Sequence, residues 1–156
     1  MKYKNYKTLK FNIDLEKNEN VLKKICNIFN LQNFIVEIFM FDDVEILKND
    51  LEIINFKYEF LKLNQNQYKC VVNLEISKLK HLLNIFSKYK CEELNIWNDV
   101  NLDDIINDNI IQTSFYLNYN KEENKTIEIT YNTKKYINLP NPKQICKFIL
   151  NQSEMQ

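Results

Sequence analysis

Three carboxylates occur where the chain could bring them together for metal chemistry. Asp42 and Asp43 directly follow the apolar run 34–41, which is typical of a central strand, and Asp14 lies near the end of an earlier alternating segment. If both strands end at the same edge of one sheet, the three side chains converge there. Carboxylates arranged in this way suit two divalent cations, the geometry used for phosphoryl transfer.

This arrangement resembles the palm of polymerases and nucleotide cyclases, over the first third of the chain. The resemblance implies a metal-dependent phosphoryl-transfer enzyme that uses Asp14, Asp42 and Asp43. The composition opposes that interpretation, because the chain has no glycine for a phosphate-binding loop and no arginine to hold a triphosphate. The alternative is a solvated turn with a helix cap, and we therefore expect no catalytic residue, no metal and no cofactor.

A second group of carboxylates lies in the segment 99–108 and consists of Asp99, Asp103, Asp104 and Asp108. Asn101 with Asp104 resembles a capping arrangement, so the segment predicts a short helix. The apolar residues expected to face the sheet are Val100, Leu102, Ile105 and Ile106. Carboxylates at a helix start complement the helix dipole without further function. As a surface they could steer a basic protein, and we interpret all four as partner-binding residues.

Histidine and cysteine offer little for catalysis. His81 is the only histidine, which excludes a site that needs two, and it lies opposite the most apolar part of its predicted helix, so we expect it in water. The chain has four cysteines, Cys26, Cys70, Cys91 and Cys146, and no two of them form a Cys-x-x-Cys motif. Most of them fall on apolar faces of predicted elements, as small buried side chains do. We expect free thiols in a reducing cytoplasm.

The charges balance, with 21 basic and 21 acidic residues. No net field therefore draws the protein to nucleic acid or to anionic membranes, and we expect neither as a direct partner. The longest apolar run, 34–41, is interrupted by Glu37 and is too short to span a bilayer. The first residues are basic but lack the apolar core of a signal peptide.

Hydrophobic periodicity predicts mixed α and β structure. Apolar residues alternate in segments typical of strands, at 7–15, 56–60, 68–76, 94–97, 114–119 and 126–131. They recur with a helical period in 21–30, 77–90 and a last helix that begins at Asn141-Pro142. The segment 42–54 has no clear period and is predicted only as a loop with a short element.

The order of these elements predicts an α+β fold. We expect a ferredoxin-like β-α-β-β-α-β antiparallel sheet over residues 1–97, with both helices on one face. A β-hairpin and a terminal helix in residues 98–156 should extend this core, and the whole chain, 1–156, should form a single domain. Ile25, Phe29, Leu82, Leu83 and Phe86 are the predicted buried residues of the two helices.

These observations favour a small, non-catalytic, cytoplasmic binding protein. Its most specific version is an inhibitor, immunity-type or phage-encoded, that meets a basic nuclease or nucleic-acid-binding protein with its acidic surface. Two alternatives stay open. One is a ligand-sensing ferredoxin-like module, because paired β-α-β units often bind small molecules, and the other is the metal-dependent enzyme at Asp14, Asp42 and Asp43.

Overall fold

One antiparallel sheet organises the protein. The computed structural model describes residues 5–41, 44–64, 66–89 and 91–154, and within them seven strands lie in the order β1-β7-β6-β5-β2-β4-β3. The strands are β1 (Tyr6–Asn12), β2 (Asn33–Met40), β3 (Lys57–Lys62), β4 (Tyr68–Glu75), β5 (Glu93–Asn98), β6 (Phe115–Asn120) and β7 (Thr126–Asn132). The helices are α1 (Asn20–Ile28), α2 (Val44–Ile53), α3 (Leu79–Lys88), α4 (Leu102–Ile106) and α5 (Pro142–Glu154).

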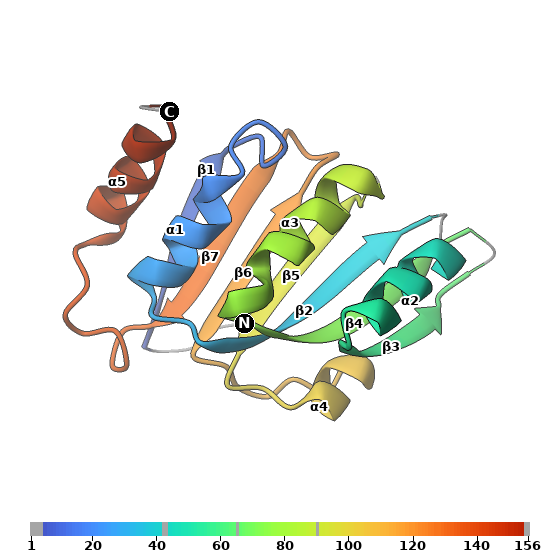
Figure 1. The fold of residues 1–156 in the computed structure, drawn as a ribbon. Coiled ribbons are helices and arrows are strands. Elements are labelled where there is room, and N and C mark those ends of the chain that lie inside the picture. The colour runs from blue at the N-terminus through green and yellow to red at the C-terminus, as the bar shows by residue number, and fades with distance from the viewer. Residues whose placement is uncertain (1–4, 42–43, 65, 90, 155–156) are drawn as a thin grey trace.

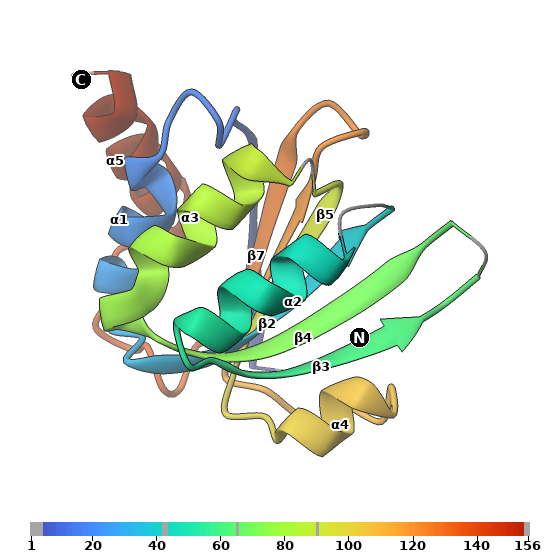
Figure 2. The ribbon, with the colours of Figure 1, turned by 45° about the vertical axis from the view of Figure 1, so that its right-hand side comes forward.

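The two faces of this sheet are covered very differently (Figures 1 and 2). Helices α1, α2, α3 and α5 lie on one face, where their buried side chains form the main core, and the short α4 lies on the other. Under α4, Ile105 packs with Ile35, Val71 and Trp97, which come from β2, β4 and β5. Much of the second face therefore carries no helix, and we refer to it as the open face.

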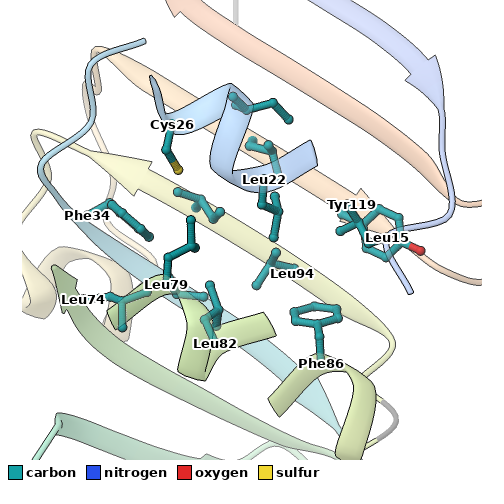
Figure 3. Close-up of a cluster of buried hydrophobic side chains, with 14 of the residues drawn as sticks. Leu15, Leu22, Cys26, Phe34, Leu74, Leu79, Leu82, Phe86, Leu94 and Tyr119 are labelled. Carbon is teal, nitrogen blue, oxygen red and sulfur yellow. The ribbon is translucent and has the colours of Figure 1, made fainter. Parts of the chain in front are cut away.

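The main core is built from the helical stripes that the sequence predicts. Ile25, Phe29, Leu82 and Phe86 are buried, whereas Leu83 is only half-buried at the edge of the core. Figure 3 shows how side chains from α1 and α3 meet those of the strands beneath, among them Leu22, Leu82, Phe86, Leu94 and Tyr119. The expected placement of both helices on one face is thus confirmed.

The α+β class is confirmed, but the ferredoxin-like sheet over residues 1–97 is not, because the order of the strands differs. β1 lies at the edge of the sheet beside β7, and β5, β6 and β7 separate it from β2. The crossovers β2-α2-β3 and β4-α3-β5 do interleave, in the order β5-β2-β4-β3. A split β-α-β arrangement is therefore present, but it begins at β2, one strand later than the sequence predicts.

Several local elements match the sequence prediction closely, and others differ. The hairpin of β6 and β7 joins the sheet, and α5 begins at Pro142 with the Asn141 side chain accepting a hydrogen bond from the Gln144 backbone N–H at 2.9 Å. The segment 42–54 contributes a ten-residue helix, α2, which the sequence left as a loop with a short element. The capping bond expected from the Asn101 side chain at α4 does not form.

Three helices end in the same turn, with Asn or Asp where glycine is usual. Asn30, Asn55 and Asp108 follow α1, α2 and α4 with φ angles of 49°, 63° and 52°. At α1 the Asn30 N–H donates to the Asn27 carbonyl at 3.2 Å and the Leu31 N–H to the Cys26 carbonyl at 2.9 Å. Asn and Asp tolerate this left-handed backbone better than other residues with a side chain, which is how a chain without glycine closes its helices.

Asn30 provides a test of that explanation. Asn30→Ala should lower the free energy of unfolding by about 1 kcal/mol, because alanine gains nothing locally in the left-handed region. Asn30→Gly should leave stability unchanged or raise it slightly, because glycine adopts that region freely. Urea unfolding curves of the two variants measure the difference, and equal stability of both would show that the positive φ at this position carries no cost.

Candidate functional site

A buried ion pair lies on the open face beside α4. The Lys69 Nζ is 3.3 Å from Glu37 Oε2, and only 4% and 8% of the two side chains are exposed. Lys69 also lies 3.5 Å from Asp108 Oδ1 and donates to the carbonyl of Ile105 at 3.5 Å. The ammonium group therefore connects β2 and β4 to the end of α4.

Amide side chains continue this network along β5 and β6. The Asn95 Nδ2 donates to Glu37 Oε1 at 2.7 Å, and Asn95 Oδ1 accepts from the Tyr116 hydroxyl and from Asn118 Nδ2, both at 2.7 Å. Asn118 also donates to Glu93 at 2.7 Å. Because each side chain satisfies the hydrogen-bonding groups of its neighbour, the network holds these side chains in one arrangement.

The network follows the register of the sheet. Asn95 lies directly opposite Glu37 on β2 and Asn118 on β6, and Asn118 lies opposite Glu128, which in turn faces Lys10 on β1. A continuous row of polar side chains thus crosses five strands of the open face. It is buried beside α4 and becomes exposed toward β1. The open face is therefore a polar surface held in place by hydrogen bonds.

Burial dominates the electrostatics of the network. Desolvation raises the pKa of Glu37, while the hydrogen bond from Asn95 and the charge of Lys69 oppose that rise. Burial also raises the pKa of Tyr116, so its hydroxyl stays protonated and donates to Asn95. These groups hold one another and leave no activated nucleophile among themselves.

Apolar contacts hold α4 over the same region. Trp97 is buried, and its ring stacks on Tyr116 with centroids 4.0 Å apart and an interplanar angle of 27°. The Trp97 Nε1 has no hydrogen-bond partner among the described residues. The sequence expectation that the apolar side of this helix faces the sheet is confirmed, since Val100, Leu102, Ile105 and Ile106 all pack in this cluster.

The four aspartates interpreted as partner-binding residues separate into two pairs. Asp99 lies 2.5 Å from Lys135, and its pKa falls below the usual value because the Lys135 and Ser114 hydrogen bonds outweigh the effect of burial. Asp108 pairs with Lys69, as described above. Asp103 and Asp104 lie in the first turn of α4 and form no ion pair with a described residue. The acidic character of α4 toward a partner therefore rests on these two.

The strands β1 and β2, from which the alternative metal site was predicted, do not lie side by side. These strands run in the same direction, as expected, but three strands between them set them roughly 19 Å apart at the usual strand spacing. Asp14 instead pairs with Lys125 at 2.6 Å, and the hydrogen bond from Lys125 lowers its pKa. Asp42 and Asp43 lie outside the described residues.

His81, Cys26 and Cys70 are placed as the sequence predicts, whereas Cys146 is only half-buried. Cys26, Cys70 and Cys91 are buried and free, and burial raises the pKa of Cys26 and of Cys91 to about 12. Such thiols are almost entirely protonated near neutral pH and are poor nucleophiles. His81 is exposed on α3, with its ring 6.3 Å from that of Phe56.

The network of Glu37, Lys69 and Asn95 is absent from the sequence interpretation, although two signals pointed to it. Glu37 interrupts the most apolar strand of the chain, and Lys69 lies between Tyr68 and Cys70 in an alternating strand that is otherwise mostly apolar. Each alone is an ordinary charged residue. Only the pairing of β2 with β4 makes them partners, since Glu37 lies opposite Val71 and Lys69 is two residues away on the same face.

Comparison with models of protein families, with curated proteins and with solved structures finds no match to this chain. Across the part of the chain that the structure describes, no helix has both the length and the apolar character needed to cross a membrane.

Lys69→Met tests the ion pair. Removing the cation leaves the Glu37 carboxylate buried without its charge partner, so the free energy of unfolding should fall by about 3–5 kcal/mol near neutral pH. The loss should shrink in acid. The variant raises the pKa of Glu37 further above its unfolded value, so its folded state keeps a proton that the unfolded state releases as pH rises.

Urea unfolding of wild type and Lys69→Met at about pH 4 and about pH 7 measures this difference, because carboxylates that do not contact Lys69 contribute alike in both proteins. Lys57→Met, an exposed lysine of β3, is the matched control and should change stability little. A destabilisation by Lys69→Met that is the same at both pH values would contradict the assignment to Glu37.

Proposed function

We propose that this chain is a non-catalytic binding protein that inhibits a basic partner protein. It meets this partner with the carboxylates of α4, the exposed Asp103 and the half-buried Asp104, and with the adjoining open face. The observation that carries the proposal is the way α4 is held. Its own Ile105 packs on Trp97 of the sheet, and the ion pair of Lys69 with Asp108 holds the segment that follows its end. Asp103 and Asp104 are thereby presented on a rigid base.

Preorganised charges suit recognition of a macromolecule. A partner need not order the helix or the network on binding, so less conformational entropy is lost. Unpaired carboxylates accelerate association with a basic surface, and the polar row of Glu93, Asn118 and Glu128 offers further hydrogen-bonding groups beside them. A nuclease or a nucleic-acid-binding protein is the class of partner with a surface of that charge.

The proposal places the protein in the cytoplasm, as an immunity-type or phage-encoded inhibitor. Its four cysteines are free, which accords with a reducing compartment. Protonated, buried thiols and a solvent-exposed His81 accord with a protein that does not catalyse a reaction.

The variant Asp103→Asn/Asp104→Asn tests the proposal without disturbing the network. Both carboxylates are outside the internal ion pairs, so the free energy of unfolding should change by less than about 0.5 kcal/mol. Association with the partner should slow by about three- to tenfold at low salt, and high salt should slow the wild type in the same way. The immobilised chain is used to capture the partner from its host, and stopped-flow mixing of the purified pair gives the rates.

Glu19→Gln/Glu123→Gln is the matched control, since it removes the same charge from exposed positions away from α4. It should retain the wild-type association rate. Recovery of an acidic partner, an unchanged rate in the aspartate variant, or no inhibition of the captured protein's activity would each refute the proposal.

A further inference from the structure

β1 forms one edge of the sheet, and the peptide groups of Thr8 and Lys10 on its outer side have no partner among the described residues. The Ile13 N–H donates to the Lys125 carbonyl at 2.9 Å and the Thr133 N–H to the Asn5 carbonyl at 2.8 Å, so these residues form hydrogen-bonded pairs with the β7 side. Along an antiparallel ladder, hydrogen-bonded residue pairs alternate with pairs that are not hydrogen-bonded. Lys7, Leu9 and Phe11 therefore bond toward β7, and the N–H and C=O groups of Thr8 and Lys10 point away from the sheet.

Helix α5 turns this free edge into a groove. Ile145 and Ile149 of α5 are buried in the main core, and in Figure 1 the helix runs alongside α1 and β1 at the end of the sheet. Between helix and strand lies a groove of about 610 Å³. Its lining residues are Thr8, Leu9, Lys10, Pro142, Lys143, Cys146, Lys147 and Leu150. One wall is thus strand backbone and the other is a helix.

The charge of this groove is of one sign. Lys10, Lys143 and Lys147 line it, and none of its lining residues whose side chains the structure describes is a carboxylate. None of the three lysines forms an ion pair with a described residue, although ion pairs hold Lys69, Lys121, Lys125 and Lys135 elsewhere. Glu128 lies opposite Lys10 on the same face of the sheet, but it does not line the groove.

The same charge opposes pairing of two copies through β1. An antiparallel pair of β1 edges would bring Lys7 and Lys10 of one chain beside those of the other, and like charges across a strand pair are destabilising. An occupant with carboxylates meets no such repulsion. An extended segment can bond to the peptide groups of Thr8 and Lys10 while its side chains reach the lysines and the apolar part of α5.

We propose that the groove between β1 and α5 binds an extended acidic segment of a partner protein, which adds to the sheet as an eighth strand. This surface is distinct from α4, and the inference does not depend on the function proposed above. The backbone of β1 supplies the hydrogen bonds, and Lys10, Lys143 and Lys147 select for acidic side chains.

Amide exchange provides the test, because the register separates two kinds of amide on one strand. The probe is a pool of peptides of about ten residues in which Asp or Glu alternates with Val, Ile, Thr or Tyr. Binding should slow exchange at the Thr8 and Lys10 amides by about tenfold or more, while Leu9, already bonded toward β7, should change little. A matched pool with Lys in place of the acidic residues should produce no protection.

Thr8→Pro removes one groove-facing N–H and the hydroxyl contact with Thr130, but it leaves every backbone bond to β7 in place, as proline permits on an edge strand. Fluorescence anisotropy should show about tenfold weaker binding of the acidic pool to Thr8→Pro and unchanged binding to Thr8→Val, which keeps the N–H but loses the hydroxyl. Lys143→Gln/Lys147→Gln should weaken binding by about three- to tenfold and flatten its dependence on salt.

The lysine variant keeps the test valid if Thr8→Pro proves unstable, because it leaves the strand untouched. Absence of protection at Thr8 and Lys10 with the acidic pool would overturn the proposal. Equal binding of the acidic and basic pools, or equal binding by Thr8→Pro and Thr8→Val in folded proteins, would overturn it as well.

Discussion

The register of β2 between β4 and β5 is the constraint on which the rest of the structure depends. This strand pairs along its whole length with β4 and over five positions with β5, so it fixes the sheet on both sides. It is apolar on both faces, and apolar alternation alone therefore does not say which residues face the helices. A slip of one residue would move Glu37 into the main core and Val36 onto the open face.

Glu37 makes that slip unfavourable. In the observed register its carboxylate meets Lys69 and Asn95, and in the shifted one it would lie unpaired among leucines and phenylalanines. A buried ion pair contributes little net stability but strongly penalises arrangements that break it. The open-face network thus specifies the register of β2 in the sheet, and α4 packs beside the same network. The polar surface and the strand order are consequences of one pairing.

Local structure was readable from this sequence because local interactions decide it. The stripes of α1 and α3, the hairpins and the Asn141-Pro142 helix start all follow from periodicity and turn chemistry within a few residues. The partner of β1 is a different matter. It is β7, with Asn12 opposite Thr126 at one end of the pair, and every strand on this side of the sheet alternates in the same way. Alternation identifies a strand's buried face but not its neighbour, so the strand order lay beyond the sequence.

The acidic segment was readable only in part for a related reason. A chain without glycine must place Asn or Asp at left-handed backbone positions, and Asp99 and Asp108 occupy two of them, with φ of 61° and 52°. Their residue type is therefore explained by backbone geometry before any surface role is considered. Asp103 and Asp104 have helical backbone, so geometry does not require them. Their place in the first turn of α4 is instead favoured by the helix dipole.

The charge balance of the whole chain hides a separation of charge along the sheet. Asp103 and Asp104 lie on α4, over β2, β4 and β5, while Lys10, Lys143 and Lys147 gather at the edge of β1. From β4 to β1 the sheet spans roughly 24 Å at the usual strand spacing, which exceeds the Debye length of about 8 Å in physiological salt. The electrostatic fields of the two regions are therefore largely independent of one another. A net charge of zero argues against attraction to a uniformly charged polymer, but it places no limit on two local surfaces of opposite sign held apart by a rigid sheet.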